Sequence, residues 1–178
     1  MSITTTNHPL RPQDIELAQL WDIAAEVPDP EIPVISIADL GILRGVALEG
    51  DSVVITITPT YSGCPAMGTI TADVVDALKR EGFDNTRVDL VLHPAWSTDW
   101  MTEHGKEKLR EYGIAPPQGM SRRTSGPILL NLAPPTPVAC PHCHSTNTKL
   151  ISQFGSTSCK SLHTCKDCFE PFDYFKVH

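Results

Sequence analysis

Two C-x-x-C pairs near the C-terminus constrain the fold of this chain more than any other feature. The first pair is Cys140 and Cys143, the second is Cys165 and Cys168, and 21 residues separate the two pairs. Each short turn presents two thiolates to one ion, so two such turns can surround Zn²⁺ with four sulfurs. A segment this short buries little apolar surface, and a metal would supply much of its folding free energy. Residues 140–178 are therefore predicted to form a zinc ribbon around a structural Zn²⁺ ion.

Disulfides and a redox-active dithiol are the alternatives to this zinc site. The first ten residues, MSITTTNHPL, have neither the basic start nor the apolar run of a signal peptide, and no stretch is long and apolar enough to span a membrane. We therefore expect a cytoplasmic protein with no membrane partner, whose thiols stay reduced. A redox motif is normally one C-x-x-C beside a βαβ pattern, whereas this tail carries two pairs. The pattern favours the metal site.

One further cysteine and three histidines lie close to these pairs. His142, His144 and His163 could each replace a thiolate, but two complete C-x-x-C pairs already satisfy zinc. Cys159 is either a fifth, exchangeable ligand or a small buried residue beneath the pairs. Burial is the commoner behaviour of a free cysteine.

The net charge of −7 is unevenly distributed along the chain. Residues 1–113 carry eight Lys/Arg against eighteen Asp/Glu, and residues 140–178 carry four against three. Binding to nucleic-acid phosphates requires clustered Lys/Arg, and the chain offers only the isolated pair Arg122-Arg123. We therefore expect no nucleic-acid partner, and a zinc-ribbon nucleic-acid-binding module is the weakest alternative function.

Residues 1–113 are predicted to form a small α+β domain with the element order α-β-β-α-β-α. Apolar residues at helical spacing predict helices over 12–27, 65–81 and 99–112, and β-prone runs predict strands over 42–48, 53–58 and 87–92. Residues 114–139 contain six prolines and are predicted to be a Pro-rich linker. Within it, residues 128–132 are apolar enough to form an edge strand.

Cys64 stands apart from the ribbon cysteines. It precedes Pro65, which suits the first helical position, so Cys64 is expected near the helix N-cap, where the helix dipole favours a reactive thiolate. The alternative is a buried, inert thiol. The acidic residues Asp29, Glu31 and Asp39 lie in turn-forming segments, and their spacing alone indicates ordinary turn carboxylates.

Two segments of the chain resemble the signature of the iron–sulfur assembly domain family, which includes SufT-type proteins: DPEIPVISIADLGIL (29–43) and TITPTYSGCPAM (56–67). Further runs at 93–117, 153–162 and 170–176 resemble the phenylacetate-degradation branch of that family. The resemblance implies that Cys64 is a ligand for an iron–sulfur cluster or for iron. It also implies a set of residues that line or lead into the same site: Asp29, Glu31, Asp39, Thr58 and Thr60.

The resemblance further implies an accessory or maturation protein, not an enzyme, acting beside the multicomponent phenylacetyl-CoA epoxidase. It would deliver a transient iron–sulfur cluster or iron to the iron–sulfur flavin reductase or to the diiron oxygenase subunits. A non-catalytic structural or regulatory subunit is the alternative. The chain itself lacks the paired Glu-x-x-His motifs of diiron bundles and a dinucleotide fingerprint. Because one thiol cannot complete a cluster, a homodimer or a client protein would supply the remaining ligands.

Overall fold

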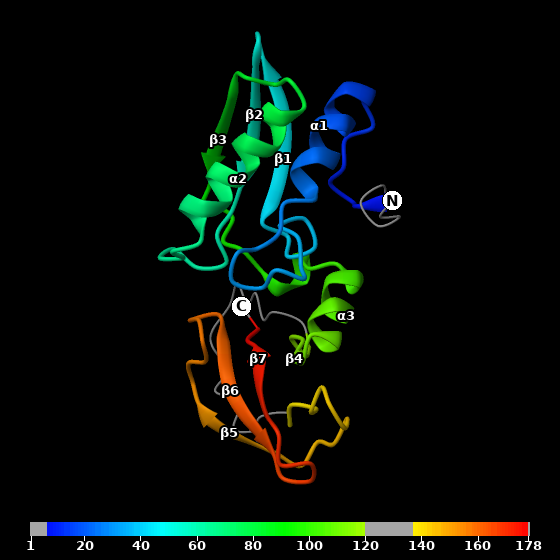
Figure 1. Ribbon diagram of the computed structural model, residues 1–178, viewed down its shortest axis with the longest axis vertical. Coiled ribbons are helices and arrows are strands. Elements are labelled where there is room, and N and C mark those ends of the chain that lie inside the picture. The colour runs from blue at the N-terminus through cyan, green and yellow to red at the C-terminus, as the bar shows by residue number, and fades with distance from the viewer. Residues whose placement is uncertain (1–6, 120–136, 178) are drawn as a thin grey trace, which may run out of the picture. The chain divides into compact units, whose positions relative to one another are not determined.

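The computed structural model describes residues 7–119 and 137–177, which belong to two compact units that divide between Lys108 and Leu109. The first unit contains a three-stranded sheet with the strand order β1-β2-β3. The second contains a four-stranded sheet with the order β4-β7-β6-β5 (Figure 1). The α+β class predicted from the sequence is confirmed.

The sheet of the first unit is a hairpin extended by a parallel strand. β1 (Leu43–Glu49) and β2 (Ser52–Ile57) are antiparallel, and Gly50, with φ of 61°, opens their two-residue loop. Glycine adopts this left-handed conformation without steric cost. β3 (Thr86–Leu90) pairs in parallel with β2. Parallel neighbours need a crossover connection, and α2 (Met67–Arg80) provides it.

Two helices pack on this sheet and build an apolar core. α1 (Ile15–Ala25) contacts β1 and α2, while α2 also contacts β3; Figure 1 shows α2 lying across the strands with α1 beside it. Asp14 caps α1, because its Oδ1 accepts the N–H groups of Glu16 and Leu17. The core contains fully buried residues from both helices and from β2: Leu20, Trp21, Ile55, Ile57, Ile70 and Val74.

The third predicted helix, over 99–112, is divided in the structure. Thr98–Trp100 form a short 3₁₀ helix, η2, and α3 runs over Glu103–Glu111. Met101 between them is extended, with ψ of 138°, so the helical hydrogen bonding is interrupted there. Thr102 then caps α3, because its Oγ1 accepts the N–H of Gly105. None of the helices in the described residues is long and apolar enough to cross a membrane.

The sheet of the second unit is an antiparallel meander with one short parallel edge strand. β5 (Thr148–Ser152), β6 (Lys160–Cys165) and β7 (Pro171–Phe175) form the meander. β4 (Ile114–Ala115) pairs in parallel with the outer edge of β7. The first two residues of the predicted linker therefore belong to the ribbon sheet, and the compact unit begins at Leu109. The apolar run 128–132 lies outside the described residues.

Candidate functional site

The four cysteines of the two C-x-x-C pairs converge in the second unit. Cys140 Sγ lies 3.7 Å from Cys168 Sγ, and Cys143 Sγ lies 3.5 Å from Cys165 Sγ. All four sulfurs lie within 4.8 Å of one another. Sulfurs bound tetrahedrally to Zn²⁺, at a Zn–S distance of about 2.3 Å, stand about 3.8 Å apart. The donor set therefore fits a tetrathiolate metal site.

Both C-x-x-C turns end on a residue with a left-handed backbone. His144, with φ of 62°, follows Cys143, and Phe169, with φ of 65°, follows Cys168. In both turns the backbone N–H two residues beyond the second cysteine acts to lower the pKa of that cysteine. Such N–H groups stabilise the negative charge of a thiolate. The two turns thus present their sulfurs in the same way, although their sequences differ.

The environment shifts the thiol pKa values of this group in different directions. The backbone N–H groups of Cys168 and Asp167 lower the pKa of Cys165 to about 7. At Cys168 the N–H of Glu170 also lowers the pKa, but burial and the neighbouring sulfurs together raise it to about 12. Adjacent thiolates repel one another, so a divalent cation is needed for all four to be deprotonated together.

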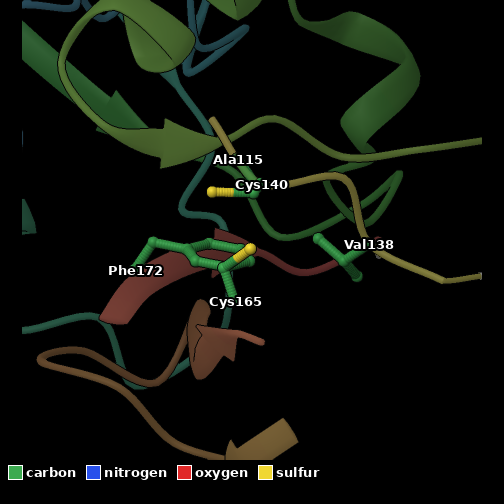
Figure 2. Close-up of a cluster of buried hydrophobic side chains, with 5 residues drawn as sticks. All are labelled: Ala115, Val138, Cys140, Cys165 and Phe172. Carbon is green, nitrogen blue, oxygen red and sulfur yellow. The ribbon is translucent and has the colours of Figure 1, made fainter. Parts of the chain in front are cut away.

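A small apolar core supports the sulfurs. Ala115, Val138 and Phe172 pack against Cys140 and Cys165, and all five side chains are buried (Figure 2). Ala115 comes from β4, so the strand found in the predicted linker also contributes to the support of the metal site. This packing holds two of the four thiols, those of Cys140 and Cys165, in place.

The other candidate ligands of the ribbon make different contacts. Cys159 is buried, with its Sγ 3.0 Å from Thr157 Oγ1, and does not belong to the converging sulfur group. His163 Nε2 lies 3.1 Å from Ser161 Oγ, and its ring stacks on Phe172. Across residues 7–119 and 137–177, the four cysteines are the only group of three or more ligand side chains whose atoms converge in this way.

Cys64 lies in the first unit, on the loop from β2 to α2, and is half-buried. Its N–H donates to the carbonyl of Tyr61 at 3.1 Å, so a tight turn closes before the helix begins. α2 starts at Met67 with Ala66 as its N-cap residue, so Pro65 is not the first helical residue as predicted, and Cys64, expected near the N-cap, lies two residues before it. Because the effect of a helix dipole is concentrated at the first turn, the case for Cys64 rests on its accessible loop position instead.

Three segments meet at the end of the sheet from which the Cys64 loop emerges. β2 and β3 are parallel, so the loops that follow them, 58–66 and 91–97, leave from the same end of the sheet. Leu43 pairs with Ile57, which brings the segment preceding β1 to that end as well. This segment contains the three predicted acidic residues. Ligands of open parallel sheets commonly bind at the carboxyl ends of the strands.

Asp29 organises the turn in which it lies. It is 6% exposed, and its Oδ1 accepts the N–H of Glu31 at 2.8 Å and the N–H of Ile32 at 2.9 Å. Such an Asx turn fixes the backbone locally. The Glu31 side chain is half-buried beside it. Asp29 therefore shapes the segment, whatever else it contacts.

Asp39 connects the same segment to α3. Its Oδ1 accepts the Thr102 hydroxyl at 2.7 Å, and its Oδ2 lies 3.1 Å from Lys108 Nζ. Of the two predicted threonines, Thr58 is buried and donates its N–H to the Ile42 carbonyl at 2.9 Å, while Thr60 is half-buried in the Cys64 loop. Through these contacts Asp39 and Thr58 stabilise the end of the sheet from which the Cys64 loop emerges.

Comparison with known proteins assigns both units. The PaaD zinc beta ribbon domain matches residues 125–176, and the iron-sulfur cluster assembly protein family matches residues 17–90. An Escherichia coli K12 protein, provisionally named as one of the subunits of 1,2-phenylacetyl-CoA epoxidase, is 48% identical over 161 residues, which are 90% of this chain and 93% of that protein. The chain belongs to the PaaD family.

Other relatives match a part of this PaaD-family chain. The Fe-S protein maturation auxiliary factor of Porphyromonas gingivalis is 38% identical over 85 residues, which are 46% of this chain and 78% of that protein. A crystal structure of a domain of unknown function from Bacillus anthracis is 33% identical, with a TM-score of 0.48, and the match covers 52% of this chain and 90% of that one. The PaaD-family assignment thus joins a ribbon that contains the four-cysteine site to an assembly-type domain that contains Cys64.

Proposed function

We propose that this chain is an accessory protein of the phenylacetyl-CoA epoxidase system that assists insertion of an iron–sulfur cluster or iron through Cys64. The observation that carries the proposal is the position of Cys64, a half-buried thiol on the loop at the carboxyl end of β2, inside the segment that matches the iron-sulfur cluster assembly family. The names of the two relatives support both parts of the proposal, because one is named as part of the epoxidase and the other as an Fe-S maturation factor.

Cys64 would act as a transfer ligand for its cargo. A thiolate is a soft donor that suits iron–sulfur clusters, but such clusters ordinarily need four ligands. One Cys64 therefore leaves the coordination of the cargo incomplete, and a second copy of the chain or a client protein supplies the other ligands. Incomplete coordination favours release to a client that offers a full set. The clients proposed are the reductase and oxygenase components of the epoxidase, located with this chain in the cytoplasm.

We further propose that Cys140, Cys143, Cys165 and Cys168 hold one structural Zn²⁺. Their sulfur separations support a tetrahedral site, and four thiolates leave no open position for a substrate or water. The ion would contribute to folding of the ribbon, whose apolar core is small. The transfer site at Cys64 and the zinc site then have separate tasks.

No step of the epoxidation is assigned to this chain. Diiron oxygenases use several carboxylates and histidines that converge between long helices, and the converging ligands in the described residues are all cysteines. A non-catalytic structural subunit is the second candidate, favoured by the name of the Escherichia coli relative. Stable, stoichiometric co-purification with the oxygenase subunits would favour that second candidate.

The test uses a strain that lacks this protein and is complemented with the wild type, with Cys64→Ser, or with Ser62→Ala. The Ser62 variant is the matched control, because it alters an exposed residue of the same loop and leaves the thiol in place. We expect reductase or oxygenase purified from the Cys64→Ser strain to be deficient in iron or labile sulfide, with normal flavin. Components from the Ser62→Ala strain should match the wild type.

Two outcomes would contradict the accessory role. Full iron and sulfide occupancy in the Cys64→Ser strain would show that the thiol is not a transfer ligand. Full occupancy in the deletion strain, with activity lost only at turnover, would instead indicate a catalytic or structural subunit, because assembly changes cofactor occupancy whereas catalysis changes the reaction barrier.

A further inference from the structure

A cavity of about 580 Å³ opens in the first unit, and no residue of the Cys64 loop is among the described residues that line it. Its walls come from the segment that starts at residue 7, from β1 and from the connection between η2 and α3. Leu10, Trp100 and Met101 provide apolar surface, and Arg44 provides a cation. The volume lies within the range of about 300–1,000 Å³ that is typical of small-molecule sites.

Arg44 lies against an aromatic ring. Its guanidinium carbon lies 3.6 Å from the centroid of the Trp100 ring. Among the described residues, no carboxylate forms an ion pair with Arg44, whereas Arg11 and Arg87 pair with carboxylates at 2.6 and 2.8 Å. Arg44 is half-buried, and burial lowers its pKa. A half-buried cation is partly removed from water, so an anion would pair with it more strongly than with a fully exposed arginine.

A β-bulge places Arg44 at the cavity. Leu43 pairs with Ile57 and Gly45 pairs with Thr56, so β1 has one extra residue opposite a single step of β2, and that residue is Arg44. A bulge re-aims the side chain that it carries and is common beside binding sites. No local pattern in the sequence marks this register shift, so the sequence alone does not distinguish Arg44 from other surface arginines.

The part of the wall that contains Trp100 is fixed by close packing. A β-carbon added at Gly41 would lie 2.6 Å from Trp100 Cβ, so the backbone at Gly41 touches η2 directly. The N–H of Thr102 donates to the Asp39 carbonyl at 2.9 Å, which fixes the next turn of the chain. A wall held in this way does not have to become ordered when a ligand binds, and such preorganisation favours affinity.

We propose that this cavity binds a small apolar monocarboxylate. The guanidinium of Arg44 would pair with the carboxylate, and the apolar body would lie against Trp100 and Met101. Arginine suits a carboxylate because its planar fork can make two parallel hydrogen bonds. Polyphosphates are disfavoured, because Arg44 is the one arginine or lysine among the described lining residues, and the exposed residues Asp99 and Glu103 add two carboxylates to the lining. This binding site is independent of the role proposed for Cys64.

Isothermal titration calorimetry of the full chain tests this with three probes: phenylacetate, octanoate and phenylacetamide. We expect saturable 1:1 binding of at least one acid, and the preferred acid shows whether the cavity selects a flat or a flexible body. The uncharged amide should bind at least about tenfold more weakly, because it loses a charge-assisted pair. No saturable binding of either acid, or equal affinity for phenylacetate and phenylacetamide, would overturn the proposal.

Two arginine variants separate the cavity from general surface charge. Arg44→Gln should weaken acid binding at least about tenfold, whereas Arg87→Gln, at an exposed position on β3, should not change it. If Arg44→Gln does not fold, amide chemical shifts of the wild type decide instead. Shifts centred on Arg44 and Trp100 support the site, and shifts confined to other residues refute it.

Discussion

Replacement of Gly41 by Ala should destabilise the first unit by about 2–4 kcal/mol. Two effects contribute to this figure. The φ of Gly41 is 73°, and a left-handed conformation costs an alanine about 1 kcal/mol. The new methyl group would also stand 2.6 Å from Trp100 Cβ and 2.7 Å from its carbonyl oxygen. Relief of that overlap requires η2 to move, and overpacking of this kind costs about 1–3 kcal/mol.

Gly50→Ala is the matched control for the backbone effect. Gly50 has φ of 61°, and a β-carbon there would meet nothing within 4 Å, so only about 1 kcal/mol should be lost. Urea unfolding followed by tryptophan fluorescence measures both variants, because all three tryptophans belong to the first unit. A Gly41 variant no less stable than the Gly50 variant would refute the close approach of Gly41 to η2.

Three further predictions concern the ribbon, the acidic segment and pH. The wild type should contain about one zinc ion per chain. Cys140→Ala should lose the ion and unfold the ribbon without changing tryptophan fluorescence. An unchanged zinc content of this variant in metal analysis would contradict the tetrathiolate site. Asp39→Ala leaves the Thr102 hydroxyl and the Lys108 ammonium without their acceptor, so it should cost about 2–3 kcal/mol in urea unfolding, and an unchanged midpoint would remove Asp39 from this structural role. Burial lowers the pKa of His8 although Asp39 opposes this, so folding favours the neutral ring. The first unit should therefore lose stability as the pH falls from about 7 to about 5, where the unfolded chain gains the proton, and the loss should be smaller in His8→Phe.

The elements of the first unit could be predicted because their signals are local. The glycine of the hairpin lies between two β-prone runs, and the helices carry apolar residues at helical spacing. The helix ends differ from the prediction: α1 begins after Asp14, whose carboxylate caps it, and not at Pro12. α2 begins later than predicted because a turn ending at Cys64 closes first. These errors displace an end by a few residues and leave the fold unchanged.

The parts that could not be predicted depend on contacts between distant residues. The interruption before α3 accompanies a hydrogen bond from the N–H of Thr102 to the carbonyl of Asp39. The position of Arg44 depends on the register of β1 against β2. The four cysteines, in contrast, could be grouped from their spacing, because one ion explains two C-x-x-C pairs together. The acidic residues carry no such chemical signal in their spacing.

The short strand β4 has a consequence for any shortened form of the ribbon. A fragment that starts at Cys140 would keep all four sulfurs but would lose Ile114 and Ala115, and with them the partner of the outer edge of β7. An uncovered strand edge presents unpaired N–H and C=O groups to any other chain. Such a fragment would be prone to add a strand from a second molecule and to self-associate. These two residues, far from the cysteines in sequence, thus cover part of the outer edge of β7.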